Sequence, residues 1–421
     1  MSVLQLGTAK EDVTPLKSIK LAGFGHRKGE ATGIFERLYL RGFLLKQAND
    51  YFLLFVADFI WWDTAFVQKM KEKIEVKYQI PKEQIVFHAT HNHSGPQMSP
   101  RFSRHLGECK EGYLENVEEK LIQSVMNLFQ DLEEVSLLEY EGTSKIGINR
   151  RKITDNKVVM EPNPEGAVDN TLKIFSFVNE TNEKKAIWIH YTCHPTTTDE
   201  NVISGEFPGV CCHKLEEEYP GSNAAFLQGF CGDIRPALIR NEKFYRGSID
   251  DMLRIGETFF DDVQQILKST GKISKDVPFV FREKEIPVTF SDENSESRVP
   301  AMLKDEWPHL VSAIDGDYFL ILHYIKLSEC LEFVTCNAEL VHAYGTFLKK
   351  QNEMVTPLGY SNGMVGYIPT SKQLKEGGYE ADESLFYFGY PSKIANEMEN
   401  IIKMEMKKLM RKDFEYDRDH S

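Results

Sequence analysis

Apolar residues run directly into a cluster of histidines in the stretch Ile85-Val-Phe-His-Ala-Thr-His-Asn-His-Ser-Gly-Pro96. Val and Phe favour a buried strand, whereas Gly and Pro force the chain to turn. In an extended segment, His91 and His93 lie two residues apart and therefore share one face. Imidazole is a common zinc ligand, and open α/β folds bind ligands where strands end. The stretch therefore predicts a metal site at a sheet edge, with a histidine-rich surface turn as the alternative.

Length and composition are those of one large globular domain. The chain has 421 residues, of which 41% are hydrophobic and 27% charged, so it has ample material for a core. A net charge of −14 without any basic cluster argues against a nucleic-acid partner. No apolar run approaches the ~20 residues of a membrane span, and no export signal is evident. Seven scattered cysteines without a CxxC pair favour a reducing, cytoplasmic location.

The segment before the histidine cluster has the pattern of a β–α–β unit. The continuous apolar run 51–58 ends in Asp58 and is followed by a helical pattern over 64–77. This order predicts a parallel strand pair that places Asp58 and His91 at the same edge. Asp58 is then either a hydrogen-bond partner of a ligating histidine or a carboxylate at the helix start. We expect an α/β fold with mixed, largely parallel sheets flanked by helices, without internal repeats.

Two further predicted strands end in turns that carry reactive side chains. His190 lies inside the first of these strands and is expected to be a core histidine, whereas His194 lies at its exit. The second strand leads into a glycine turn that presents Asp233 and Arg235. Three such junctions strengthen the prediction of a functional site more than any single one does.

Three other candidates come from less distinctive surroundings. Arg150 belongs to an expected loop, where an arginine is either solvated or clamps an oxyanion. Glu339 precedes a predicted helix, where a carboxylate is by default a partner of the helix dipole. Tyr367 lies in a short predicted strand within 363–370.

Several motifs resemble those of neutral, non-lysosomal ceramidases. Thr90-His-Asn-His-Ser-Gly-Pro96 is similar to the family's Thr-His-Thr-His-Ser-Gly-Pro signature. The resemblance extends over about residues 5–390 and includes His194-Pro-Thr with Ser204-Gly205, Asn149-Arg150, Gln228-Gly-Phe-Cys-Gly-Asp-Ile-Arg-Pro236 and the start at Gly7-Thr-Ala-Lys-Glu-Asp-Val-Thr-Pro15. It implies a single ceramidase-like catalytic domain over 1–412, followed by an acidic, disordered tail over 413–421. We expect neither the family's C-terminal β-sandwich domain nor its export signal.

The resemblance also implies a ligand set for one zinc ion. Its ligands would be His91, His194, Glu339 and Tyr367, although Asn337-Ala338 replaces the family's usual Pro-Gly before the glutamate. Such a set of two histidines, a glutamate and a tyrosine would also accept other divalent ions.

The main departure from the family is Arg235. It occupies the position of a serine implicated in ceramidase catalysis, and a guanidinium that stays protonated cannot act as a nucleophile. Chemistry is then expected to rely on water activated by zinc. A fixed cation beside the metal would also favour a substrate with a carboxylate or phosphate, and ceramide has neither.

The resulting prediction is a zinc-dependent amidohydrolase that acts on a small anionic or amphiphilic molecule. His93 or Asp233 would take the proton of the water, Arg150 would stabilise the oxyanion, and Arg235 would bind an anionic substituent. Ester cleavage, metal-dependent isomerisation or epimerisation of a sugar acid, and a non-catalytic binding scaffold are the alternatives.

Overall fold

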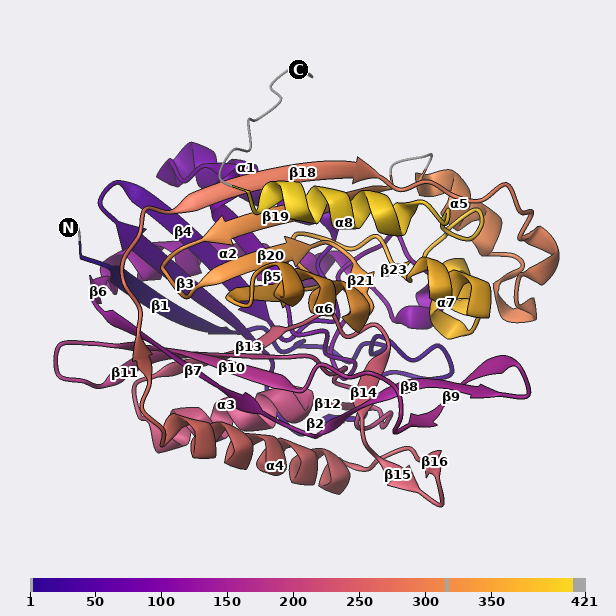
Figure 1. Cartoon of the computed structure of the whole chain (residues 1–421), viewed down its shortest axis with the longest axis horizontal. Helices are drawn as coiled ribbons and strands as arrows, with labels where there is room; N and C mark the ends of the chain where they lie inside the picture. The colour runs from indigo at the N-terminus through magenta and orange to yellow at the C-terminus, as the bar shows by residue number, and fades with distance from the viewer. Residues whose placement is uncertain (1–2, 315–317, 412–421) are drawn as a thin grey trace.

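The computed structural model describes residues 3–314 and 318–411, and the expected tail over 413–421 lies outside these ranges. The protein is a single mixed α/β domain in which three sheets dominate (Figure 1). The first sheet is formed by β1 (Gln5–Asp12), β3 (Tyr39–Gln47), β4 (Asp50–Ala57), β5 (Ile85–Ala89) and β6 (Glu133–Glu134). The second contains β7 (Ser136–Thr143), β10 (Thr171–Val178), β11 (Lys184–Tyr191), β13 (Asn223–Gln228) and β17 (Lys272–Ile273). The third contains β18 (Val280–Pro287), β19 (Phe319–Lys326), β20 (Glu332–Cys336) and β22 (Val355–Leu358).

The three sheets repeat one topology. In each, three consecutive antiparallel strands are followed by a helical crossover to a fourth strand that runs parallel to the third. The crossover helices are α1 (Thr64–Tyr78), α3 (Glu206–Glu218) and α6 (His342–Gln351). The sequence contains no recognisable repeat, so this repetition exists at the level of topology alone. The repeat is not recognisable in the sequence because the three units share their strand order but not their amino-acid sequences.

The sheets are mixed, as expected, but antiparallel pairs outnumber parallel ones. The predicted parallel pairing of β4 with β5 is present, and each unit contains only one such pair. Continuous apolar runs predict strands buried on both faces, and parallel sheets are the usual reason for such burial. Here the strands are buried because the three sheets pack against one another. One cluster of buried side chains draws on all three, including Leu6, Phe43, Phe175, Trp188 and Phe333.

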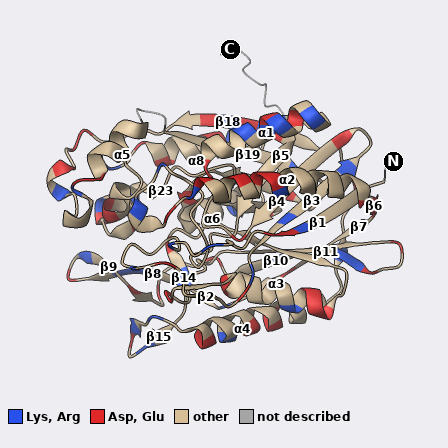
Figure 2. Ribbon diagram, turned by 180° about the vertical axis from the view of Figure 1, so that it is seen from behind, with Lys and Arg blue, Asp and Glu red and all other residues tan. Residues whose placement is uncertain are grey.

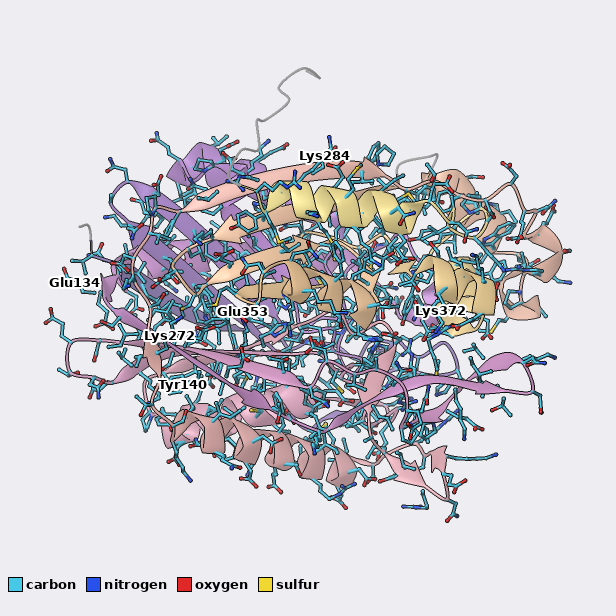
Figure 3. All side chains as sticks on the ribbon, viewed as in Figure 1. Glu134, Tyr140, Lys272, Lys284, Glu353 and Lys372 are labelled. Atoms are coloured by element: carbon cyan, nitrogen blue, oxygen red, sulfur yellow. The ribbon has the colours of Figure 1, made fainter. Side chains whose placement is uncertain are left out.

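Helices cover the outer faces of the sheets. α1 and α2 (Glu111–Gln130) pack on the first sheet, α3 and α4 (Ile249–Leu267) on the second, and α6 and α8 (Met398–Leu409) on the third (Figure 1). Charged residues of both signs are distributed along these outer elements (Figure 2). Glu134 in β6, Lys284 in β18 and Lys372 in α7 are likewise exposed (Figure 3). No helix in the described ranges is long and apolar enough to cross a membrane.

Shorter elements complete the chain around the ends of the sheets. The minor strands are β2 (Gly33–Ile34), β8 (Gly147–Thr154), β9 (Lys157–Asn163), β12 (Val202–Ile203), β14 (Ile234–Pro236), β15 (Ile239–Arg240), β16 (Lys243–Phe244), β21 (Glu339–Leu340) and β23 (Tyr367–Ile368). The short helices are α5 (Trp307–Ile314) and α7 (Ser371–Glu376). Arg150, expected in a loop, lies in β8, which pairs with β9 and β14. Glu339, expected at a helix start, lies in β21, which pairs with β23.

Three buried histidines make the fold sensitive to acid. Burial lowers the pKa of His88, His190 and His323 to about 3 each. His88 Nε2 accepts the backbone N–H of Gln228 at 2.8 Å, so a proton on this atom would break the bond. As the pH falls below about 6.5, these histidines take up protons in the unfolded chain but not in the folded one. Each of them then lowers the free energy of unfolding by about 1.4 kcal/mol per pH unit.

We therefore expect the free energy of unfolding of the metal-free protein, measured in urea, to fall between pH 7 and pH 4.5. His88→Gln should reduce this pH dependence by about one proton's contribution, although it lowers stability at pH 7. His309→Gln, at an exposed position, is the control and should leave the slope unchanged. A slope that is the same in wild type and His88→Gln would contradict the prediction.

Candidate metal centre and active site

The three repeated units meet at one buried cluster of side chains. His91 follows β5, His194 follows β11, and Glu339 follows β20, so each unit supplies one residue. Glu339 Oε1 lies 3.1 Å from His91 Nε2 and 2.8 Å from His194 Nε2. All three side chains are buried. The carboxyl ends of strands that are distant in sequence thus converge on one point, as expected of an α/β binding site.

Backbone carbonyls orient both imidazoles toward this point. His91 Nδ1 lies 2.8 Å from the carbonyl oxygen of Ile60, and His194 Nδ1 lies 2.8 Å from that of Ile234. A carbonyl oxygen only accepts hydrogen bonds, so each Nδ1 carries a hydrogen in the neutral ring. The Nε2 lone pairs therefore face the carboxylate of Glu339. Such contacts on the far nitrogen are those that orient metal-binding histidines.

The charge states of this cluster suit a divalent cation. Burial, helped by Arg150, lowers the pKa of His194 to about 4, so its ring is neutral at pH 7. Burial alone would raise the pKa of Glu339, but the neighbouring histidines hold it well below its usual range. An ionised carboxylate and the Nε2 atoms of two imidazoles thus lie together, and this is a donor set that suits a divalent cation. In a tetrahedral site with bonds of 2.0–2.1 Å the donor atoms lie about 3.3 Å apart, close to the separations found around Glu339.

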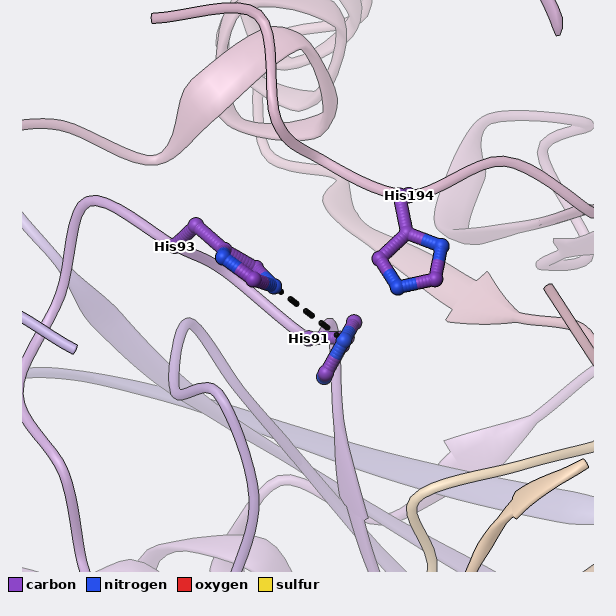
Figure 4. Close-up of side chains that lie close together, drawn as sticks. All are labelled: His91, His93 and His194. Carbon is purple, nitrogen blue, oxygen red and sulfur yellow. Dashed lines mark hydrogen bonds between the residues drawn. The ribbon is translucent and has the colours of Figure 1, made fainter. Parts of the chain in front are cut away.

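His93 lies beside the same cluster. Its Nε2 is 3.2 Å from His91 Nε2, and the ring nitrogens of His91, His93 and His194 all lie within 4.8 Å of one another (Figure 4). Burial and the two other histidines lower the pKa of His93 well below its usual value. His93 Nδ1 has no hydrogen-bond partner within the described ranges.

The histidine segment is a turn, and the expected extended geometry is wrong. β5 ends at Ala89, and His91 has φ 63°, in the left-handed region that non-glycine residues rarely adopt. The side chain of Asn92 stabilises the turn by donating to the carbonyls of Asp58 and Ser204. His91 and His93 therefore meet because the backbone turns between them.

Arg150 and Tyr367 form the next part of the site. Tyr367 Oη lies 3.4 Å from His194 Nε2 and accepts a hydrogen bond of 3.0 Å from Arg150 Nη2. Arg150 Nε also donates to Glu380 at 2.8 Å, and Glu380 in turn binds Arg151. This buried network holds the Arg150 guanidinium next to Tyr367. The tyrosine is therefore brought to the histidines, as expected, together with the arginine.

The carboxylates of the two acidic candidates, Asp233 and Asp58, bind other partners and make no contact with His91 or His194 among the described interactions. The Asp233 carboxylate accepts bonds from the backbone N–H and Nδ1 of His342 and from Gln373 Nε2. Asp233 thus holds the start of α6 and does not line the cavity described below. Asp58 forms a buried ion pair with Arg41 at 3.0 Å, so neither of its two expected roles applies. Of the two residues predicted to take a proton, only His93 is positioned to do so.

A cavity of about 430 Å³ opens onto this cluster. His93, His194, Arg150, Tyr367 and Arg235 contribute to its wall. The remaining wall is partly apolar, with Phe24, Leu106, Met160, Met302, Tyr379 and Tyr387, and partly polar, with Thr196, Thr197, Thr198, Asp199 and Arg246. Its size is that of a site for a small molecule.

Comparison with known proteins identifies the family. Residues 4–243 match the family model described as "Neutral/alkaline non-lysosomal ceramidase, N-terminal". The chain belongs to this ceramidase family. Neutral ceramidase from Pseudomonas aeruginosa has a similar fold, with a TM-score of 0.78 at 16% identity over 97% of this chain and 74% of that one. A ceramidase complexed with C2 gives 0.79 at 17% identity over 97% and 75%. No curated protein matches significantly.

The family resemblance did not reveal every residue that supports the site. In this ceramidase-family chain, Tyr360 stacks on His91 with 3.9 Å between ring centroids, and Glu380 fixes Arg150. Neither residue has a distinctive sequence pattern. A third residue, Gly23, supports the site because the His93 ring packs closely against it.

Gly23 leaves room for the His93 ring. It has φ +90°, and a Cβ at this position would lie 2.1 Å from His93 Nδ1. We expect Gly23→Ala to displace His93 and to lower kcat/KM at least about 10-fold, because catalytic groups tolerate little misplacement. Metal content, measured by elemental analysis, should stay unchanged.

The matched control is Gly112→Ala in α2, where a Cβ meets nothing within 4 Å. This variant should keep full activity and gain about 0.5–1 kcal/mol of stability. Full activity in Gly23→Ala would show that the position of the His93 ring is unimportant.

Proposed function

We propose that this protein is a zinc-dependent hydrolase that cleaves the amide bond of a small molecule. The observation that carries the proposal is the convergence of His91, His194 and Glu339, all buried, beside a cavity lined by Arg150 and His93. Membership of the ceramidase family supports hydrolysis, and the similar structures are themselves described as ceramidases.

His91, His194 and Glu339 would hold the metal ion, and Tyr367, whose Oη lies 3.4 Å from His194 Nε2, would be the fourth donor. When bound, zinc supplies a Lewis acid that polarises a carbonyl and makes water nucleophilic near pH 7. The far nitrogens of both histidines stay bound to backbone carbonyls, so the rings need not rotate to accept the ion.

The other side chains of the site have separate roles in this proposal. His93 is neutral at pH 7 and lines the cavity, so its ring can accept a proton from water and return it to the leaving amine. Arg150 presents a fixed guanidinium next to Tyr367, where it can stabilise an oxyanion. Arg235, in place of the serine expected from the ceramidase motif, leaves water as the nucleophile.

The direct test is a panel of N-acyl amides and the corresponding esters, assayed by mass spectrometry with zinc-loaded protein. We expect the amides of the panel to be cleaved at neutral pH, with release of the amine and the acid. Exchange of a substrate hydrogen for deuterium without bond cleavage, in a parallel panel of sugar acids, would instead support an isomerase. Binding without turnover in either panel would support a scaffold.

His93→Gln tests the assignment of the proton carrier. Removing a general base typically costs 10²–10⁴-fold, and we expect kcat to fall about 10²-fold while zinc stays bound. Asp233→Asn is the matched comparison and should mainly lower stability, because Asp233 supports α6. Loss of zinc in His93→Gln would show instead that His93 is a metal ligand.

A further inference from the structure

We propose that the cavity selects substrates that carry a carboxylate or a phosphate beside the scissile amide, and that Arg235 is the residue that binds this anion. The inference names the substrate class of the proposed hydrolase and therefore rests on that function. Three observations on the Arg235 side chain support it: its lack of a partner in the described ranges, the acidic groups around it, and its position in the cavity.

Arg235 is a charged group without a partner. In the described ranges its guanidinium makes no ion pair or hydrogen bond, and its Nε is buried. Its guanidinium carbon lies 4.5 Å from the ring centroid of Phe244, so stacking holds the side chain in place. Burial, together with the charge of Arg150, lowers the pKa of Arg235 to about 10, which leaves it charged at pH 7. The side chain is half-buried, with its Nε shielded from water, so within the described ranges no carboxylate of the protein occupies the guanidinium that an anion in the cavity would meet.

The acidic side chains whose charge reaches Arg235 are bound elsewhere. Glu206 accepts bonds from the backbone N–H groups of both Thr197 and Thr198. Asp199 binds His26 at 2.8 Å and Arg246 at 3.0 Å. Neither carboxylate is within ion-pair distance of Arg235, so an anion from solution has no internal competitor to displace.

Arg235 would hold this anion in the same cavity as the residues proposed to act on the amide. Arg235 lies in β14, which pairs with β8, the strand that carries Arg150. Both arginines line the cavity that His93 and His194 also line. Phe24, Leu106, Met302 and Tyr387 also line this cavity and give it an apolar surface. An amide with an anionic group on one side and a short apolar acyl group on the other matches this wall.

The test compares N-hexanoylglycine, its neutral isostere N-hexanoylglycinamide and N-hexanoylaminomethylphosphonate. Because the anion would gain a charge-assisted hydrogen bond, we expect the wild type to prefer an anionic amide about 10–100-fold in kcat/KM. Arg235→Gln should bring this preference to within about 3-fold while zinc stays bound. Arg235→Lys should keep part of it, because lysine retains the charge without the planar fork. The carboxylate and phosphonate arms show which anion is preferred.

Arg240→Gln is the matched control, because Arg240 is an exposed arginine on the neighbouring strand β15 and stacks on Tyr245 outside the cavity. The Arg240→Gln variant should prefer anionic amides to the same extent as the wild type. Calorimetric titration with the same compounds separates the two proposals. Tighter binding of the anionic compounds that depends on Arg235, without turnover of any amide, would support the anion site and count against the hydrolase. Turnover of amides with no charge preference, or with a preference that survives in Arg235→Gln, would overturn the anion site and leave the hydrolase.

Discussion

Replacing His91 or His194 by alanine is expected to remove the bound metal and the activity together. Each side chain supplies an Nε2 lone pair to the point where Glu339 Oε1 also lies. With one imidazole missing, too few donors remain for a tight site, and we expect kcat/KM to fall by about 10⁴-fold or more because water is no longer activated. Metal content after dialysis, measured by mass spectrometry, should fall from about one ion per chain to near zero.

His309→Ala is the control for both variants, since His309 is exposed in α5. It should keep both metal and activity. Circular dichroism verifies that the His91 and His194 variants remain folded. A variant that is folded and active without metal would show that these histidines have another role.

Replacing Glu339 by glutamine is expected to change stability in opposite directions with and without metal. In the metal-free protein, the Glu339 carboxylate lies 2.8 and 3.1 Å from two Nε2 atoms, and at a pH where both rings are neutral neither it nor these nitrogens can donate a hydrogen bond. The amide of glutamine can donate to these nitrogens, so the metal-free variant should be more stable than wild type by about 1 kcal/mol. With zinc in excess, the order should reverse, because the variant has lost the anionic ligand and gains less from binding.

Thermal unfolding of both proteins with chelator and with zinc tests this crossing, and activity should fall by about 10³-fold in the variant. Glu353→Gln, at an exposed position, should show no crossing. If Glu339→Gln were less stable than wild type in chelator as well, Glu339 would have a structural role independent of metal.

Part of the site was predictable from where strands end. The positions of His91 and His194 follow from apolar runs that stop at a turn, and the structure brings both residues together. Glu339 had an ordinary interpretation as a dipole partner, and only the family resemblance pointed to it. Its place in the site depends on the pairing of β21 with β23, two-residue strands too short to leave a periodic pattern.

Asp233 shows why the remaining candidates could not be resolved from the sequence. A carboxylate at a strand exit has the same pattern whether it faces a metal or the start of a helix. The outcome was decided by α6, more than a hundred residues later in the chain, whose first residue His342 binds Asp233. The prediction of the fold from the sequence was limited in a similar way. Apolar runs such as 51–58 indicate burial, but they do not indicate strand direction or which sheet provides the cover.

The three repeated units are proposed to hold one divalent cation together. Native mass spectrometry of the purified wild type, alone and after equilibration with zinc, beside His91→Ala, measures this directly. We expect one tightly bound ion per wild-type chain, retained through dialysis, and none in the variant. If the wild type bound no ion at micromolar zinc, or if His91→Ala bound it equally well, the proposed metal site would be wrong.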